Sequence, residues 1–306
     1  TVLSNLSKIG RVGGFIGSVN GKTDMTLYLE YCSNNGSIIG NSSDVGGFIG
    51  YIGNVTSMSL SISSCTNHGI VNGSFRVGGF IGHIIYNNIL FMTLSNNTVN
   101  GSIRGMGCVG GSVGEIYTNT NTNLSMFNNH IYGTVSGVSS YIGGFIGYIR
   151  DATNTVLTVS KCTIDGDITT QSGYVGGFIG GTEGRANMNL SISECIHNGN
   201  VSGNRNPAGG MIGSIRGITN ATISISNSIH TGNTKTSGDP AGGIVGSIFD
   251  NTQIQLILTQ SLNNGSVTGS STGGVAGRIE KTITLKSAFP ISHMITLGLL
   301  GLLHQI

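Results

Sequence analysis

The sequence predicts an all-β protein folded as a parallel β-solenoid, and three observations carry this prediction. A stretch close to VGGFIG recurs in nine copies at spacings of 31–33 residues. A strictly alternating apolar segment follows in several units, and an Asn-Gly or Asp-Gly corner follows that segment. A period this steady is typical of repeat architectures that build one supersecondary unit per repeat. We expect about nine coils of 31–33 residues, with roughly three strands in each.

The opening motif predicts a strand with tight glycine corners. Two glycines after the marker residue of each copy, and a third five residues along, occur in every copy. Because equivalent positions of a solenoid lie above one another, a glycine that one coil needs is needed in all coils. The marker residues are Val12, Val45, Val77, Val109, Ile142, Val175, Ala208, Ala241 and Thr272.

The third residue after the marker predicts an aromatic ladder inside the solenoid. Its members are Phe15, Phe48, Phe80, Phe145 and Phe178, with an interruption at Ser112 and replacement by Met211, Ile244 and Val275. The next residue is usually Ile, although a flat strand points two neighbours to opposite faces. Either a bend or bulge at the glycines turns both inward, or the Ile row packs on another layer or another copy of the protein.

Two further segments complete each unit. Met58, Leu60 and Ile62 alternate with serines, which indicates a half-buried strand and not a helix. A short third segment follows the Asn-Gly corner, as in GIVNG at 69–73. Asn tolerates the left-handed backbone of such corners and Gly adopts it freely. Coils stacked at about 4.8 Å would form a rod roughly 40 Å long.

The chain divides into three predicted parts. Residues 1–11 are a partial N-terminal coil, residues 12–290 are the repeat solenoid, and residues 291–306 are an apolar tail. The apolar core of the tail, from Met294 to Leu303, is too short for a membrane span. We expect the tail to cap the open end of the solenoid or to begin a truncated anchor.

Composition and charge limit the classes of partner. Gly makes up 52 of 306 residues without a collagen-like period, and the 38% hydrophobic content argues against disorder. A net charge of +2 without runs of Lys or Arg argues against nucleic acid as a partner. Frequent Asn-X-Ser/Thr sequons are compatible with an extracellular glycoprotein. Their asparagines are Asn5, Asn35, Asn41, Asn54, Asn72, Asn96, Asn100, Asn123, Asn189, Asn200, Asn220 and Asn264.

Cysteine and histidine recur at fixed repeat positions. Cys32, Cys65, Cys162 and Cys195 share one position, which predicts a ladder of inward thiols, with a disulfide between coils as an alternative. No Cys-x-x-Cys pair and no neighbouring His accompanies them, so we expect no metal. His197 and His230 share another position in adjacent coils, and we expect them to be solvated corner residues. No cofactor is expected.

One stripe of charges stands out in a chain with only 8% charged residues. It is expected to form alternating salt pairs on a solvated loop edge, a binding edge for a glycan or protein, or, least of all, a catalytic site. Glycosidases need two carboxylates about 5–10 Å apart, which makes the acids of the stripe the relevant candidates. The binding candidates are Arg150, Asp151, Glu183, Arg185 and Arg216, followed along the chain by Asp250, Arg278 and Glu280.

The unit GGFIG…SxCxNxGxVxG resembles the GLUG repeat, which is named for its Gly-Leu-Uaa-Gly core and found in large bacterial surface proteins. The resemblance covers residues 12–277. It implies an extracellular or surface-anchored stalk or adhesin without a defined catalytic role. This chain differs in its longer coil, which has an added alternating strand, and in having Phe-Ile where Leu-Val is usual.

Three functions follow as hypotheses. The first is a non-enzymatic cell-surface solenoid that serves as an adhesin-like stalk or a scaffold for a glycan or protein partner. The second is a structural filament subunit that self-associates through its ends or an apolar face. The third is a polysaccharide-active β-helix enzyme. Regular Thr-x-Thr ranks of the kind used for ice binding are missing.

Overall fold

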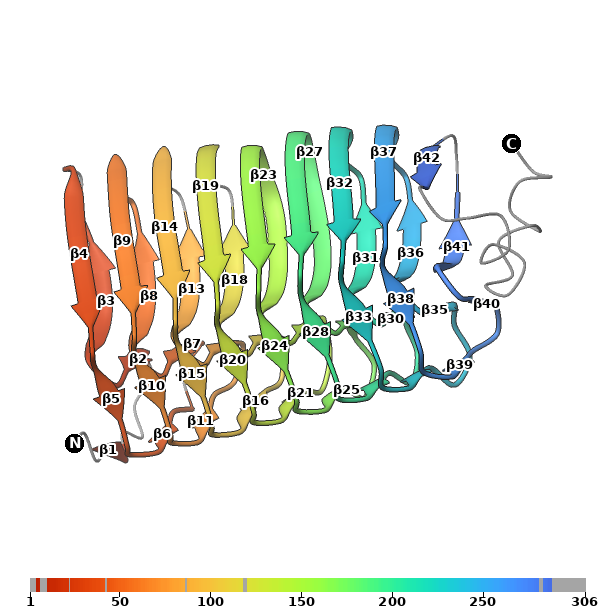
Figure 1. Ribbon diagram of the computed structural model, residues 1–306. Helices are drawn as coiled ribbons and strands as arrows, with labels where there is room; N and C mark the ends of the chain where they lie inside the picture. The colour runs from red at the N-terminus through yellow and green to blue at the C-terminus, as the bar shows by residue number, and fades with distance from the viewer. Residues whose placement is uncertain are drawn as a thin grey trace.

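The computed structural model describes residues 4–5, 10–21, 23–41, 43–85, 87–117, 120–280 and 283–287. Within these ranges, all regular structure is β-strand, and strands of neighbouring coils pair in parallel. The protein is a parallel β-solenoid of about eight turns, whose coils stand side by side from the N-terminal to the C-terminal end (Figure 1). The predicted fold class is confirmed. The predicted tail at 291–306 lies outside the described residues.

The repeat motif forms its own sheet, which we call the motif sheet. Nine successive strands of this sheet are separated by eight turns of the chain. The nine copies of the motif in the sequence therefore correspond to a solenoid of about eight turns. The strands are β2 (Arg11–Gly13), β7 (Asp44–Gly46), β12 (Arg76–Gly78), β17 (Cys108–Gly110), β22 (Tyr141–Gly143), β26 (Tyr174–Gly176), β30 (Ala208–Gly209), β35 (Ala241–Gly242) and β40 (Thr272–Gly273).

The large sheet has two arms in each coil, of which the first rises and the second returns in Figure 1. First-arm strands are β3 (Ile16–Asn20), β8 (Ile49–Gly53), β13 (Ile81–Ile85), β18 (Val113–Tyr117), β31 (Ile212–Arg216), β36 (Val245–Phe249) and β41 (Ala276–Ile279). Second-arm strands are β4 (Met25–Glu30), β9 (Ser57–Ser63), β14 (Ile89–Ser95), β19 (Thr120–Phe127), β32 (Thr219–Ser226), β37 (Thr252–Thr259) and β42 (Ile283–Ser287). Two long strands, β23 (Ile146–Ser160) and β27 (Ile179–Ser193), contain both arms.

Two sheets of short strands close the coil below the arms. The corner sheet consists of β5 (Ser33–Asn34), β10 (Thr66–Asn67), β15 (Thr98–Val99), β20 (His130–Ile131), β24 (Thr163–Ile164), β28 (Ile196–His197), β33 (Ile229–His230) and β38 (Leu262–Asn263). The base sheet consists of β1 (Ser4–Asn5), β6 (Ile38–Ile39), β11 (Val71–Asn72), β16 (Ile103–Gly105), β21 (Val135–Gly137), β25 (Ile168–Thr170), β29 (Val201–Ser202), β34 (Thr234–Lys235) and β39 (Val267–Thr268).

Most coils therefore contain five strand segments where the sequence predicted three. The opening motif is not one extended segment, because the chain bends between β7 and β8 at Gly47 and Phe48. The two-residue strands of the corner sheet are too short for any alternation to reveal them.

The bend explains the two neighbouring apolar rows. Phe48 and Ile49 are both fully buried, and both belong to the core between the arms. A Cβ atom at Gly50 would lie 2.7 Å from the carbonyl oxygen of Val12, because the motif sheet lies directly on this part of the first arm. This close approach is a physical reason for a glycine at that repeat position in every coil.

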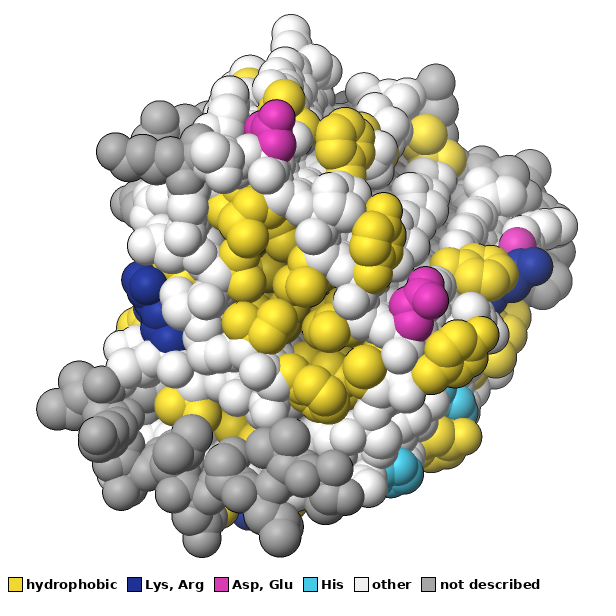
Figure 2. Space-filling model, turned by 90° about the vertical axis from the view of Figure 1, so that its left-hand side faces the viewer, with side chains coloured by type: hydrophobic (Ala, Val, Ile, Leu, Met, Phe, Trp, Pro, Cys, Tyr) yellow, Lys and Arg dark blue, Asp and Glu magenta, His cyan; other side chains and the backbone are white. Residues whose placement is uncertain are grey.

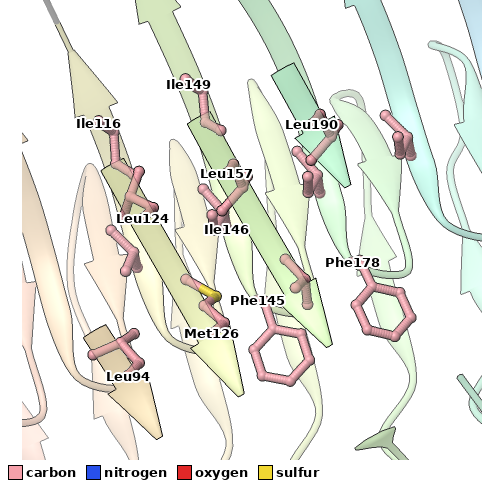
Figure 3. Close-up of a cluster of buried hydrophobic side chains, with 14 of the residues drawn as sticks. Leu94, Ile116, Leu124, Met126, Phe145, Ile146, Ile149, Leu157, Phe178 and Leu190 are labelled. Atoms are coloured by element: carbon pink, nitrogen blue, oxygen red, sulfur yellow. The ribbon is translucent and has the colours of Figure 1, made fainter. Parts of the chain in front are cut away.

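Part of the core lies between the two arms, where Ile116 and Ile149 stand side by side on the first arm, Leu157 projects from the second arm, and Phe145 lies below them (Figure 3). The aromatic column has ring centroids 4.7 Å apart for Phe15 and Phe48, 4.9 Å for Phe48 and Phe80, and 5.5 Å for Phe145 and Phe178. Stacked rings at such distances add to the burial that holds coils together. Phe15, in the first described coil, is 40% exposed, whereas Phe48 is fully buried.

The cysteine column contains asparagine and serine as well. Cys65, Cys162 and Cys195 are fully buried, Cys32 is partly buried, and all are free thiols. In this column a side chain accepts a hydrogen bond from the backbone N–H of the preceding coil, as the Cys162 thiol does from Asn129 at 3.4 Å. The same role falls to Asn97, Asn129, Ser228 and Ser261. The side chains of this column therefore satisfy backbone N–H groups at the corner between the second arm and the corner sheet.

The expectation for the two histidines is wrong. His197 and His230 are fully buried, and their rings stack at 4.8 Å in the inward-facing column that contains Ile131 and Ile164. The sequence period placed them together but did not reveal the inward direction. Burial lowers the pKa of His197 to about 4 and that of His230 to about 3, so both rings are neutral at pH 7.

Candidate functional site

Three columns of stacked residues, one on the motif sheet and two on the first arm, form a strip that we call the charged strip. The first column precedes the marker residue, and the other two lie six and eight residues after it on the first arm. The columns hold five of the 14 Lys and Arg residues, four of the 12 acids and five of the nine tyrosines. The strip is therefore a concentration of charge in a chain that otherwise has little.

The members of each column follow the register of the strands. The first column contains Arg11, Asp44, Arg76, Cys108, Tyr141 and Tyr174. The second contains Tyr51, His83, Glu115, Tyr148, Gly181 and, further on, Arg278. The third contains Tyr117, Arg150, Glu183, Arg216 and Phe249.

The N-terminal half of the strip is a closed ionic network. The Arg76 guanidinium lies 2.8 Å from the Asp44 carboxylate and 2.5 Å from the Glu115 carboxylate, whose side chains are only 8% and 3% exposed. The His83 ring nitrogens lie 3.5 Å from Asp44 and 3.6 Å from Glu115. Arg150 approaches Glu115 from the next coil at 3.7 Å. Since a buried charge is tolerated only with partners, loss of one member would destabilise these coils, and the paired groups leave little for a ligand.

The network also sets protonation states. Burial by itself raises the pKa of Asp44, but hydrogen bonds and positive charge from His83 and Arg76 outweigh it and hold the pKa below its usual value. Burial lowers the pKa of His83, and the charge of Arg76 acts in the same direction. At neutral pH we therefore expect a charged Asp44 and a neutral His83.

The C-terminal half of the strip is more open. Arg150, Glu183 and Arg216 stand in consecutive coils of the third column. The Arg150 guanidinium lies 3.9 Å from the ring centre of Tyr117, and that of Arg216 lies 5.3 Å from the ring centre of Phe249. The two arginine side chains are 35% and 42% exposed, so each presents donors to solvent while its ring neighbour holds it in place.

A tyrosine cluster fills the strip between these halves. The rings of Tyr141 and Tyr148 stack with centroids 3.7 Å apart, and Tyr174 stacks on Tyr141 at 4.9 Å. The Tyr148 hydroxyl donates to the Glu183 carboxylate at 2.5 Å. A Cβ atom at Gly181 would lie 2.3 Å from the Tyr141 ring, so this glycine makes room for the cluster. Burial raises the pKa of Tyr141 to about 12, which keeps it protonated.

The residues of the predicted stripe are only partly brought together. Arg150, Glu183 and Arg216 share a column, but they stand on strands and not on a loop edge, and Arg150 pairs with Glu115. Asp151 comes one residue after this column with a φ of 51°. The side chain of Arg185 lies outside the described part of the structure.

The ionic network and the tyrosine cluster were not predicted from the sequence. Asp44, Arg76 and Glu115 lie far apart along the chain, each in a different repeat unit. Writing the repeats under one another by their marker residues would have shown Arg, Asp and Arg in one column. The contact of this column with the second one depends on the bend at the glycines, which the sequence pattern left open.

The strip offers arginine donors, carboxylate acceptors and partly exposed aromatic rings, a set of groups that can recognise sugars or protein loops. Among the described residues, no three His, Cys, Asp or Glu side chains lie close enough to hold a metal ion. The described part of the chain also contains no helix that is long and apolar enough to span a membrane.

Comparison with known proteins gives no relative. No model of a protein family matches the chain, and no curated protein and no solved structure matches it.

Proposed function

We propose that the protein is a non-enzymatic repeat solenoid of the cell surface or extracellular space that binds a glycan or protein partner through the open half of the charged strip. The observation that carries the proposal is the column Tyr117, Arg150, Glu183, Arg216 and Phe249. It places alternating charges and aromatic rings at strand spacing on a rigid sheet. A rigid surface loses little entropy on binding.

The sequence adds support for location and lineage. The units resemble GLUG repeats of bacterial surface proteins, and this lineage is part of the proposal. The sequon asparagines with described side chains are all exposed: Asn35, Asn41, Asn54, Asn72, Asn96, Asn100, Asn123, Asn189, Asn200, Asn220 and Asn264. These features are compatible with a secreted protein whose stacked coils serve as a stalk.

The test is a binding screen on a glycan array and a panel of extracellular proteins. Replacing Arg150 and Arg216 together with Ala should weaken binding roughly tenfold or more, because such arginines contribute strongly to interfaces. A matched control replaces Arg104 and Lys235, exposed cations of the base sheet, and should leave binding unchanged. Equal losses in the two variants would remove the strip from consideration.

The proposal excludes catalysis at the strip. Replacing Asp151 and Glu183 together with Ala should leave turnover on a panel of plant and microbial glycans at the level of the unchanged chain. Any turnover that these carboxylates support would make the enzyme hypothesis the better one.

Self-association is the second candidate function, and one observation favours it. In the first described coil, Phe15 is 40% exposed and Met25, Leu27 and Leu29 are only partly buried, and Figure 2 shows apolar side chains gathered on this end. A solution mass measurement over a range of concentrations tests it. A strict monomer at high concentration would argue against a filament subunit.

A further inference from the structure

We propose that a second site, on the ridge where the first arm passes into the second, binds a neutral, extended β-1,4-linked glycan along the solenoid axis. The site is a shallow groove of about 340 Å³ over β23, β27 and β32. Two columns form its walls, and none of the residues that line it carries a charge. It shares no residue with the charged strip, so it does not depend on the function proposed there.

The first wall is a ladder of exposed asparagine amides. The Nδ2 atom of Asn154 donates to Oδ1 of Asn121 at 3.1 Å, that of Asn187 to Asn154 at 2.9 Å, and that of Asn220 to Asn187 at 2.9 Å. An amide has two N–H donors and two acceptor lone pairs. The ladder uses one of each at its inner members, which leaves one donor and one acceptor per coil for a ligand. The ladder also holds the amides in place before a ligand arrives.

The second wall lies two residues further along each strand. Its members in the groove are Val156, Asn189 and Thr222, and the column continues in register beyond the groove through Asn123 to Phe91. Asn189 and Thr222 offer hydrogen-bonding groups, and Val156 offers an apolar patch. Phe91, two coils before the groove, is 52% exposed, so its ring can stack on a sugar that extends beyond the groove.

The spacing of the coils along the groove favours one class of polymer. Coils follow one another at about 4.8 Å. This spacing approximates the advance per ring of an extended β-1,4-linked glycan, in which alternate rings are turned over. An extended peptide advances only about 3.4 Å per residue and would lose register with the amides. An acidic glycan would bring charge to a groove whose lining residues provide no cation. A neutral glycan, with its hydroxyl groups and apolar ring faces, fits both walls.

The first experiment measures affinity as a function of glycan length. Cello-oligosaccharides and chito-oligosaccharides are titrated against protein from a host that does not N-glycosylate, because Asn123, Asn189 and Asn220 are sequon asparagines. Affinity should rise with each added sugar and level off at about five, one for each coil from Phe91 to Thr222. No binding of either series, binding without length dependence, or equal binding of oligogalacturonate or an extended peptide would overturn the proposal.

The second experiment compares two amide ladders. Asn154→Gly combined with Asn187→Gly removes two groove amides, and glycine keeps the positive φ of 52° and 57° at these positions. Asn96→Gly combined with Asn128→Gly removes an equally exposed pair, hydrogen bonded at 2.8 Å outside the groove. The groove variant should bind roughly tenfold more weakly, and the control should bind like the unchanged chain. Unchanged binding in the groove variant would contradict the proposal.

Single substitutions of aromatic residues test the proposal independently if a double variant fails to fold. Phe91→Ser should lower affinity, whereas Phe127→Ser, which removes a ring that is 41% exposed on the same arm, should not. Equal effects of the two substitutions would count against the groove. The Arg150→Ala and Arg216→Ala variant should bind these oligosaccharides normally, which separates failure of the groove from failure of the strip.

Discussion

The same three columns run through both halves of the charged strip, but the two halves differ in how far their charged side chains are paired and buried. In the N-terminal half, Arg76 pairs with the Asp44 and Glu115 carboxylates, and its side chain is 23% exposed. In the C-terminal half, Arg150 and Arg216 rest on aromatic rings and are 35% and 42% exposed. In both halves the columns stand on strands of the same two sheets. The difference in exposure therefore comes from which side chains occupy the columns.

This difference indicates how a repeat protein can separate stability from recognition. A buried network is worth most when it is complete, because each removed partner leaves another charge unpaired. An exposed column contributes little to folding and is free to meet a partner. We infer that the N-terminal half of the strip contributes to the stability of the coils and that the C-terminal half binds a partner.

Glu115→Gln should have the largest effect on stability. The change leaves Arg76 with one carboxylate instead of two and removes the partner of Arg150, so we expect a loss of about 3 kcal/mol. Glu183→Gln in the open half should cost about 1 kcal/mol or less. Urea unfolding followed by circular dichroism measures both. Equal losses would show that the two halves do not differ as described.

Acid should act first on the buried histidines, which are His197 and His230 in the corner sheet and His83 in the charged strip, and only at lower pH on Asp44. The unfolded chain protonates His197 and His230 near pH 6.5, whereas burial keeps their folded pKa values at about 4 and about 3. Their contribution is therefore complete above pH 6.5 and is lost as pH falls toward 4, by about 3 kcal/mol for His197. The pKa of Asp44 is lowered, so its contribution is lost only below its usual value of 3.8.

Replacement of both histidines with Ile is the control for acid unfolding. Ile131 and Ile164 occupy the same column in neighbouring coils, so the substitution fits the site. Between pH 6.5 and 4 the double variant should lose less stability than the unchanged chain, with His83 as the buried histidine that remains, when unfolding is followed by urea titration at each pH. The same acid loss with and without the histidines would contradict the assignment.

Tyr148→Phe should have a smaller effect. It removes the hydroxyl that donates to Glu183 at 2.5 Å but keeps the ring stack on Tyr141. We expect a loss of about 1 kcal/mol in urea unfolding. Tyr28→Phe, at a side chain that is 65% exposed, is the matched control and should change nothing measurable. A loss of similar size at Tyr28 would mean that the Tyr148 hydrogen bond has no special role.

Cys162→Ser should have the smallest effect. The Cys162 thiol accepts from the Asn129 backbone N–H and donates to the Ser160 carbonyl, and Ser228 and Ser261 fill the same role in later coils. The change should stay within about 0.5 kcal/mol. Cys162→Ala leaves the N–H without an acceptor and should cost about 1 kcal/mol. If Ala were tolerated better than Ser, the hydrogen-bonding role of the column would be wrong.

The period of the sequence predicted the coils, the stacking of like residues and the register of Arg150, Glu183 and Arg216. These features depend only on counting along the chain. The direction of a side chain depends on bends of the backbone, which the repeat pattern does not reveal. The pattern left open how Phe48 and Ile49 could both point inward. It also predicted a solvated His197, whereas this side chain is buried. The contact of Asp44 with His83 joins two columns across the bend at the glycines, so no spacing within one unit could reveal it.

The most direct test of the division between the halves is the affinity for a partner found in the binding screen, measured for two variants under conditions where both are folded. We predict that the combined Arg150→Ala and Arg216→Ala substitutions weaken binding roughly tenfold or more, whereas Glu115→Gln changes it by less than about twofold. A loss confined to Glu115→Gln, with the arginine variant unaffected, would contradict the assignment of recognition to the open half.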